Sequence, residues 1–157
     1  MNCWFYLNSQ VTSATSNFGL LGFDTYSDQN GCSFGSVSGY TTNETFSMLD
    51  GVAPNLYART AITDNIPAGW NNIVMNWNGS SYDIWLNNKK TTISGTAPLG
   101  HVGLKSNSQN LILGDGYSSG ANKFNGRWGV FSIYNSSLTD QEISQNYNAL
   151  KPRDRDY

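Results

Sequence analysis

The chain has 157 residues and a formal net charge of -2, the size of one ordinary domain with a substantial core. Twenty Asn, nineteen Ser and sixteen Gly stand against only two Glu, while aromatic residues reach 13%. Asn, Ser and Gly favour turns over helices, whereas aromatic side chains pack well on a pleated sheet. The composition therefore excludes a helix-rich fold, and nine scattered Lys and Arg give no basic stripe for nucleic acid.

Short alternating runs bounded by turn residues predict the strands of an all-β fold. In chain order these runs are 4–7, 18–23, 44–49, 56–62, 73–77, 82–86, 111–113 and 128–134. No segment approaches the roughly twenty apolar residues that would cross a bilayer, so membrane insertion is not expected. We expect one domain over residues 1–150 and a flexible tail over residues 151–157.

The clearest local prediction is a hairpin that closes at Gly79-Ser80. Closing there gives three apolar pairs on one face: Ile73 with Leu86, Met75 with Ile84, and Trp77 with Tyr82. The other face carries Asn72 with Asn87, Val74 with Trp85, and Asn76 with Asp83. One face is therefore core and the other is polar with a single large aromatic, and a one-residue slip would expose the whole apolar set.

One helix is predicted, near the C-terminal end. Thr139 and Glu142 form a capping box, and Leu138 can pack onto Ile143 as a hydrophobic staple. Apolar residues then follow at helical spacing as far as Leu150, so one stripe of this short helix should pack on the body of the domain.

The preceding strand has large apolar residues in both of its alternating sets. One set holds Trp128, Val130 and Tyr134, and the other holds Phe131 and Ile133. Such a strand is expected to lie centrally in a sheet, covered on both faces. Trp128 is then a residue of the core or of an interface.

The order of these motifs resembles the laminin G-like, concanavalin A-like jelly roll over residues 69–150. The motifs are a Gly-Trp that opens a strand, Trp85-Leu86-Asn87-Asn88-Lys89, Leu113-Gly114, Phe124-Asn125-Gly126, Phe131 to Asn135, and Ser137-Leu138-Thr139 with Glu142-Ile143. The resemblance implies a two-sheet antiparallel jelly-roll sandwich with one short C-terminal helix. Such domains bind sugars, sometimes with calcium, or only build a particle. The segment from Ile133 to Lys151 is similar to domains of bacteriophage virion structural proteins.

Related jelly rolls include glucanases, which need two carboxylates close together on one face. Here Glu44 has no acidic neighbour within five residues, and Glu142 belongs to the capping box. The single histidine, His101, has no partner that would make it a catalyst. We therefore expect a protein that is not an enzyme.

A neutral sugar is best bound by an aromatic platform ringed by amides and hydroxyls. The first candidate platform is Trp85 with Asn72, Asn76, Asp83 and Asn87 on the polar hairpin face. The second is the loop that carries Asp115, Tyr117 and Asn122. The alternative for Trp85 is burial, either under a loop such as residues 24–38 or against a neighbouring subunit.

Metal and thiol chemistry have weaker signals. Asp24, Asp28, Asp64 and Asp115 lie in predicted loops and could supply oxygen ligands to Ca²⁺, although they lack the Asp-x-Asp-x-Asp spacing and a lone loop Asp is usually a turn former. Cys3 and Cys32 have no metal-binding spacing, and two separate thiols are expected rather than a disulfide.

The resulting hypothesis is a non-enzymatic protein on the virion surface: an appendage, capsid decoration or fibre component that binds cell-surface glycan. Its expected partners are that glycan, other virion proteins and further copies of itself. Two alternatives stay open. One is a purely architectural virion protein that touches no sugar, and the other is a carbohydrate-binding module from a larger secreted protein.

Overall fold

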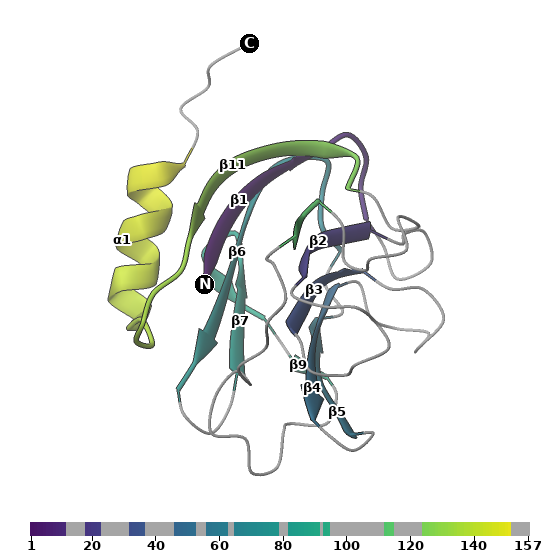
Figure 1. The fold of residues 1–157 in the computed structure, drawn as a ribbon. Coiled ribbons are helices and arrows are strands. Elements are labelled where there is room, and N and C mark those ends of the chain that lie inside the picture. The colour runs from purple at the N-terminus through teal and green to yellow at the C-terminus, as the bar shows by residue number, and fades with distance from the viewer. Residues whose placement is uncertain are drawn as a thin grey trace.

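The computed structural model describes residues 1–11, 18–22, 32–36, 46–52, 56–62, 65–78, 82–91, 93–94, 112–114 and 124–151. Within these residues the chain forms strands and one helix (Figure 1). The elements are β1 (Asn2–Leu7), β2 (Phe18–Gly22), β3 (Cys32–Ser36), β4 (Phe46–Val52), β5 (Leu56–Ile62), β6 (Gly69–Trp77), β7 (Tyr82–Leu86), β8 (Lys89–Lys90), β9 (Ile93–Ser94), β10 (Ile112–Leu113), β11 (Gly126–Ser132) and α1 (Asp140–Leu150).

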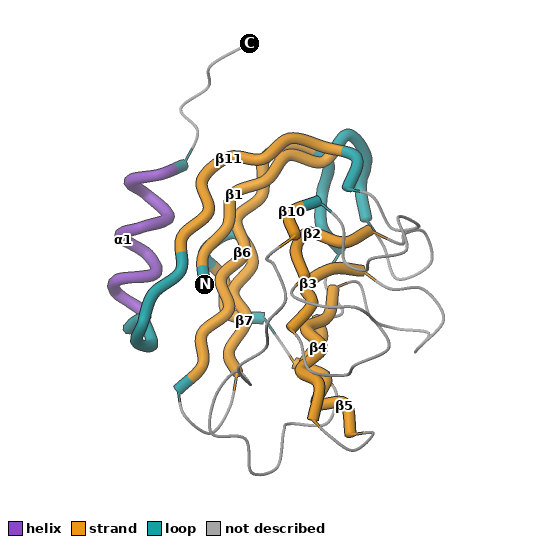
Figure 2. Tube along the Cα trace, in the orientation of Figure 1, coloured by secondary structure: helices purple, strands orange, loops and turns teal. Residues whose placement is uncertain are grey.

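Five strands form one antiparallel sheet in the order β11-β1-β6-β7-β8. The other six pair in the order β10-β2-β3-β4-β5-β9 (Figure 2). These elements confirm a mostly-β chain with one short helix. Among the six strands, the structure describes only the side chains of Leu20 and Leu113. The complete two-sheet jelly roll therefore stays a prediction.

The β6–β7 hairpin has the register that the sequence predicts. All five pairs from Ile73 with Leu86 to Trp77 with Tyr82 are present. The next turn is made by Asn87 and Asn88, whose φ angles are 51° and 65°. Asn tolerates this left-handed conformation better than most residues, and two such residues in succession join β7 to β8 in the tightest hairpin turn.

Alternation in the five-stranded sheet separates two apolar clusters. The main core lies on one face and consists of Cys3, Phe5, Leu7, Val11, Leu20, Ile66, Ile73, Met75, Ile84 and Leu86. Leu20 comes from β2, so the second set of strands contributes to this core. The smaller cluster, on the opposite face, consists of Val74, Trp85 and Ile143 with Leu138 at its edge. Each fully buried large apolar side chain contributes about 1.5–3 kcal/mol.

The helix α1 begins where its capping box predicts. The Thr139 hydroxyl accepts a hydrogen bond from the Glu142 amide at 3.3 Å, and the Glu142 carboxylate accepts from the Thr139 amide at 2.8 Å. These hydrogen bonds from Thr139 lower the pKa of Glu142. Leu138 packs on the cluster of Ile143, as the predicted staple requires. With eleven residues, this one described helix is too short and too polar to reach across a bilayer.

Strand β11 differs from its prediction, because it lies at the edge of the sheet and not at its centre. Phe5 pairs with Trp128 and Cys3 with Phe131, so two residues of β11, Gly129 and Val130, stand opposite one residue of β1. This register shift resets the alternation. Trp128 and Phe131 therefore both pack against the main core, which confirms the core prediction for Trp128, while Val130 is 41% exposed.

Cys3 is a free thiol with no exposed surface, in the middle of the main core. The side chain of Cys32 lies outside what the structure describes, so two separate thiols stay a prediction. Burial disfavours the thiolate and raises the pKa of Cys3 from 9.0 to about 12. Cys3 behaves as a small apolar residue and not as a nucleophile.

This burial predicts a loss of stability in alkali. Below pH 9.0 the thiol is protonated in both states, and above it only the unfolded chain releases the proton until the pH reaches about 12. Across that window the free energy of unfolding should fall by up to about 1.4 kcal/mol per pH unit more in the native chain than in Cys3→Ala. Denaturant titrations of both chains at a series of pH values measure the difference. Parallel curves would show that Cys3 ionises freely in the folded state.

Candidate functional site

We define the outer face as the side of the five-stranded sheet that points away from the main core. Helix α1 lies against this face (Figure 1). Trp85 packs with Val74 of β6 and Ile143 of α1 and is only 8% exposed. The expectation of an exposed Trp85 platform is therefore wrong, because the apolar stripe of α1 covers the indole. Burial was the stated alternative, and the cover that the structure describes is α1.

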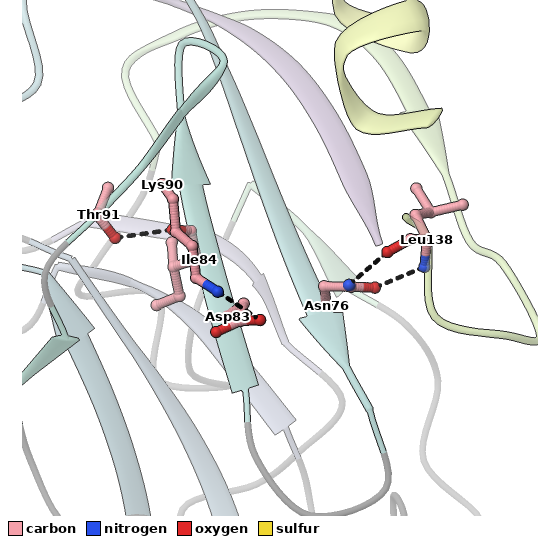
Figure 3. Close-up of polar contacts among 6 residues, drawn as sticks. All are labelled: Asn76, Asp83, Ile84, Lys90, Thr91 and Leu138. Atoms are coloured by element: carbon pink, nitrogen blue, oxygen red, sulfur yellow. Dashed lines mark hydrogen bonds and ion pairs between the residues drawn. The ribbon is translucent and has the colours of Figure 1, made fainter. Parts of the chain in front are cut away.

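Two of the predicted polar residues hold neighbouring segments in place (Figure 3). The Asn76 amide nitrogen donates to the Leu138 carbonyl at 2.7 Å, and the Leu138 amide donates to Asn76 Oδ1 at 2.8 Å. This two-way contact fixes the segment that leads into α1. Asp83 pairs with Lys90 Nζ at 3.0 Å, where both side chains are partly exposed. The ion pair contributes little to stability at such exposure.

Asn72 and Asn87 belong to a network of amides that is buried at Asn72 and partly buried at Asn87. Asn72 Nδ2 donates to Asn2 Oδ1 at 2.6 Å and to the Cys3 carbonyl at 3.1 Å. Asn87 Oδ1 accepts from the Asn72 backbone amide at 2.8 Å, and its Nδ2 donates to Asn71 Oδ1 at 2.9 Å. Asn72 has no exposed surface. Neither residue is on an exposed platform, because both side chains are used to join β1, β6 and the β7–β8 turn.

The covered half of the outer face also contains Trp4, whose ring stacks on Tyr147 of α1 at a centroid distance of 5.1 Å. Trp4 Nε1, Asn2 Nδ2 and Asn72 Oδ1 are buried here and make no hydrogen bond within the protein. Each such atom costs about 1–3 kcal/mol of desolvation.

The remaining predicted ligands lie outside the described residues. These are Asp115, Tyr117 and Asn122 of the second sugar candidate, and Asp24, Asp28 and Asp64, which with Asp115 were the candidates for Ca²⁺. Within the described part of the chain, no group of three or more His, Cys, Asp or Glu could hold a metal ion. Calcium binding by the loops stays a prediction.

The other half of the outer face is open to solvent. It lies where β1 ends and β6 and β11 begin, because Tyr6 pairs with Trp70 on one side and with Arg127 on the other. Asn8 and Asn125 continue the same face by one further step of the alternation. We call these five residues the outer aromatic patch: Tyr6, Asn8, Trp70, Asn125 and Arg127.

Trp70 is the more exposed of the two aromatic side chains of the patch, at 39%. Its ring lies 5.6 Å from that of Tyr6 at an interplanar angle of 77°, an edge-to-face contact. A Cβ built on Gly129 would lie 3.0 Å from Trp70 Cζ3, so the indole reaches across β1 as far as β11. The missing side chain at Gly129 makes room for it. Trp70 is thus held in one orientation while part of its surface faces water.

Arg127 and two amides complete the patch. The guanidinium carbon of Arg127 lies 4.2 Å from the centroid of the Tyr6 ring, a cation–π contact. Asn8 Nδ2 donates to Asn125 Oδ1 at 3.0 Å, and both residues are exposed. Asn8 Nδ2 also donates to the Asn125 carbonyl at 3.4 Å. These bonds use the Asn8 donor and the Asn125 acceptor, which leaves Asn8 Oδ1 and Asn125 Nδ2 for a ligand. An aromatic surface with a polar rim is therefore present, at a different place from the one predicted.

The sequence carries a signal for this patch. Trp70 has the same parity as Asn72, Val74 and Asn76, so alternation already places it on the polar hairpin face. Its exposure could not be inferred in the same way, because alternation identifies a face and not what covers that face.

A family model described as the concanavalin A-like lectin/glucanases superfamily, Laminin_G_3, matches residues 1–144. The match includes every strand, the outer aromatic patch and the first half of α1. No curated protein matches the chain at a significant level. Neither finding concerns a virion, so the likeness to bacteriophage domains stays a prediction.

The position of Trp85 predicts a structural role for it. Trp85→Ala and Ile143→Ala should each lower the free energy of unfolding by about 2–5 kcal/mol, because each opens a cavity between the sheet and α1. Their effects should not add, since both remove the same contact. Gln145→Ala, on the exposed side of α1, is the control and should change it by less than about 0.5 kcal/mol. Urea unfolding of these three variants and of the Trp85→Ala/Ile143→Ala double variant measures this. A neutral Trp85→Ala would contradict the packing.

Proposed function

Because the chain belongs to the concanavalin A-like lectin/glucanases superfamily, we propose that it is a non-enzymatic carbohydrate-binding domain and that the outer aromatic patch is its sugar-binding surface. The family is compatible with carbohydrate binding, although one fold hosts many functions. The site itself therefore has to carry the argument. The observation that carries it is the solvent-exposed and oriented indole of Trp70.

The side chains of the patch are complementary to the groups that a sugar presents. A sugar ring presents a flat apolar side edged by hydroxyl groups, so it needs an aromatic surface with hydrogen-bonding groups around it. Trp70 and Tyr6 supply two rings at nearly right angles, and Asn8 and Asn125 supply amides at the rim. Because neighbouring side chains already hold Trp70, binding does not have to order it, which saves conformational entropy.

The proposal that the protein is not an enzyme rests on the carboxylates whose side chains the structure describes. Glu142 is held by Thr139 at the start of α1, and Asp83 is paired with Lys90. Neither belongs to the outer aromatic patch. Hydrolysis of a glycosidic bond would need two carboxyl groups flanking the bound sugar. Within the described residues, the patch brings no such pair together.

We also propose that the domain is displayed on a virion surface, where it would contact cell-surface glycan and neighbouring coat proteins. The support is the likeness of residues 133–151 to bacteriophage domains and a composition rich in Asn and Ser with few charges. Immunogold labelling of intact particles tests this location. Label confined to disrupted particles, or absent altogether, would refute it without affecting the sugar site.

Replacing Trp70 should remove sugar binding without unfolding the domain. Truncation of a central Trp in a binding site typically costs about 2 kcal/mol or more, so Trp70→Ala should weaken the Kd for a bound glycan by at least about tenfold. A glycan array followed by calorimetry on the strongest ligand measures it.

The matched control is Ile133→Ala, because Ile133 is even more exposed, at 59%, and lies outside the patch. It should bind as the native chain does. Native binding that survives Trp70→Ala would place the sugar site elsewhere, and an array without any signal would refute carbohydrate binding as such.

A further inference from the structure

We propose that the sugar bound at the outer aromatic patch is acidic, and that Arg127 binds its carboxylate. This inference rests on the proposed function and adds the chemical class of the ligand. Composition alone favours a neutral glycan, since only 13% of the residues are charged. The patch itself contains a cation, and its setting leads to a different conclusion.

Arg127 is an exposed cation, and among the residues that the structure describes its side chain contacts the ring of Tyr6. Among the residues that the structure describes, no carboxylate lies within ion-pair distance of its guanidinium. Lys90, by contrast, is neutralised by Asp83 at 3.0 Å. The positive charge of Arg127 is therefore available to a ligand, on a protein whose net charge is -2.

The contact with Tyr6 places this charge in a usable geometry. A guanidinium is planar and carries its N–H groups in that plane, as a fork that matches the two oxygens of a carboxylate. Its carbon lies 4.2 Å from the ring centroid, so the ring occupies one side of the group and restrains it. The N–H groups at its rim are left to bond with an anion. Because the aromatic neighbour limits its motion, less side-chain entropy is lost on binding.

The spacing of the patch fits a short oligosaccharide. The Tyr6 ring centroid lies 5.6 Å from that of Trp70 and 4.2 Å from the guanidinium carbon of Arg127. The Trp70 ring centroid and the guanidinium carbon of Arg127 are therefore separated by no more than the sum of these two distances. A disaccharide can span that separation. One sugar ring can stack on Trp70 while the carboxylate of the same or the next ring reaches Arg127. Asn125 lies just before β11, two residues before Arg127 and on the same side of the sheet, and can bond with a neighbouring hydroxyl.

The charge also acts against neutral ligands. A neutral glycan that covers the patch would strip water from Arg127 without offering an anion in return, and this desolvation is unfavourable. An acidic glycan offsets the same loss with charge-assisted hydrogen bonds. Arg127 therefore favours acidic glycans by attraction and disfavours neutral glycans by the cost of its desolvation.

The experiment compares acidic and neutral sugars that are otherwise alike. The probes are oligogalacturonate against its methyl ester, and 3′-sialyllactose against lactose, measured by calorimetry at low salt and again at high salt. The proteins are the native chain, Arg127→Gln, Arg127→Lys and Lys89→Gln. Lys89→Gln is the matched control, because it removes an exposed positive charge on β8, outside the patch.

We expect the native chain to bind the acidic member of a pair at least about tenfold more tightly, with a preference that weakens in salt. Arg127→Gln should lower affinity for the acid to that for the neutral partner, Arg127→Lys should lie between, and Lys89→Gln should match the native chain. Equal binding of both members, or binding of a neutral sugar alone, overturns the acidic class and leaves the sugar site standing. Equal loss of binding in Arg127→Gln with both members of a pair would also overturn the acidic class, because the contact of Arg127 would then not depend on a carboxylate. Failure to bind any sugar, on these probes and on the array, overturns both proposals.

Discussion

The register of β6 between its two neighbours is the constraint on which the other features depend. Ile73 pairs with Cys3 on one side and with Leu86 on the other, and these three residues all enter the main core. One step along the strand, Val74 stands between Asn2 and Trp85 on the opposite face. A shift by one residue would exchange the two faces, placing amides in the core and the apolar set beneath α1. The main core and the outer face are thus specified together.

The outer face acquires two different environments because α1 covers only part of it. The paired hydrogen bonds between Asn76 and Leu138 determine where the segment before the helix lies, and the stack of Trp4 on Tyr147 lies near its far end. Residues of the same kind then have opposite roles. Asn72 is buried and joins strands, whereas Asn8 and Asn125 remain in water. Helix coverage, and not residue type, decides which aromatic side chains can meet a ligand.

The features that depend on residues close together in the sequence were predicted correctly. The β6–β7 pairs and the Thr139–Glu142 capping box follow from alternation and from a four-residue motif, so both were predictable to the residue. Strand β3 was not, because Cys32–Ser36 is mostly small residues with little apolar alternation. The edge position of β11 and its register shift depend on which strand it meets, and a single run of residues does not carry that information. The position at which α1 packs on the sheet likewise depends on residues far apart in the sequence. For that reason alternation predicted the correct sheet face for Trp85 but not its burial under α1.

Because α1 covers only half of the outer face, the tryptophan side chains also differ in their exposure to water. The chain has five, and Trp4 and Trp85 are at most 8% exposed while Trp70 is 39% exposed. Trp77 and Trp128 are partly buried against the main core. Iodide or acrylamide should therefore quench the long-wavelength part of the intrinsic emission first, and that part comes from the indole of the patch. Detachment of α1 would instead shift the emission of the buried pair to the red. The native protein thus carries two optical reporters, one for each half of the same sheet face.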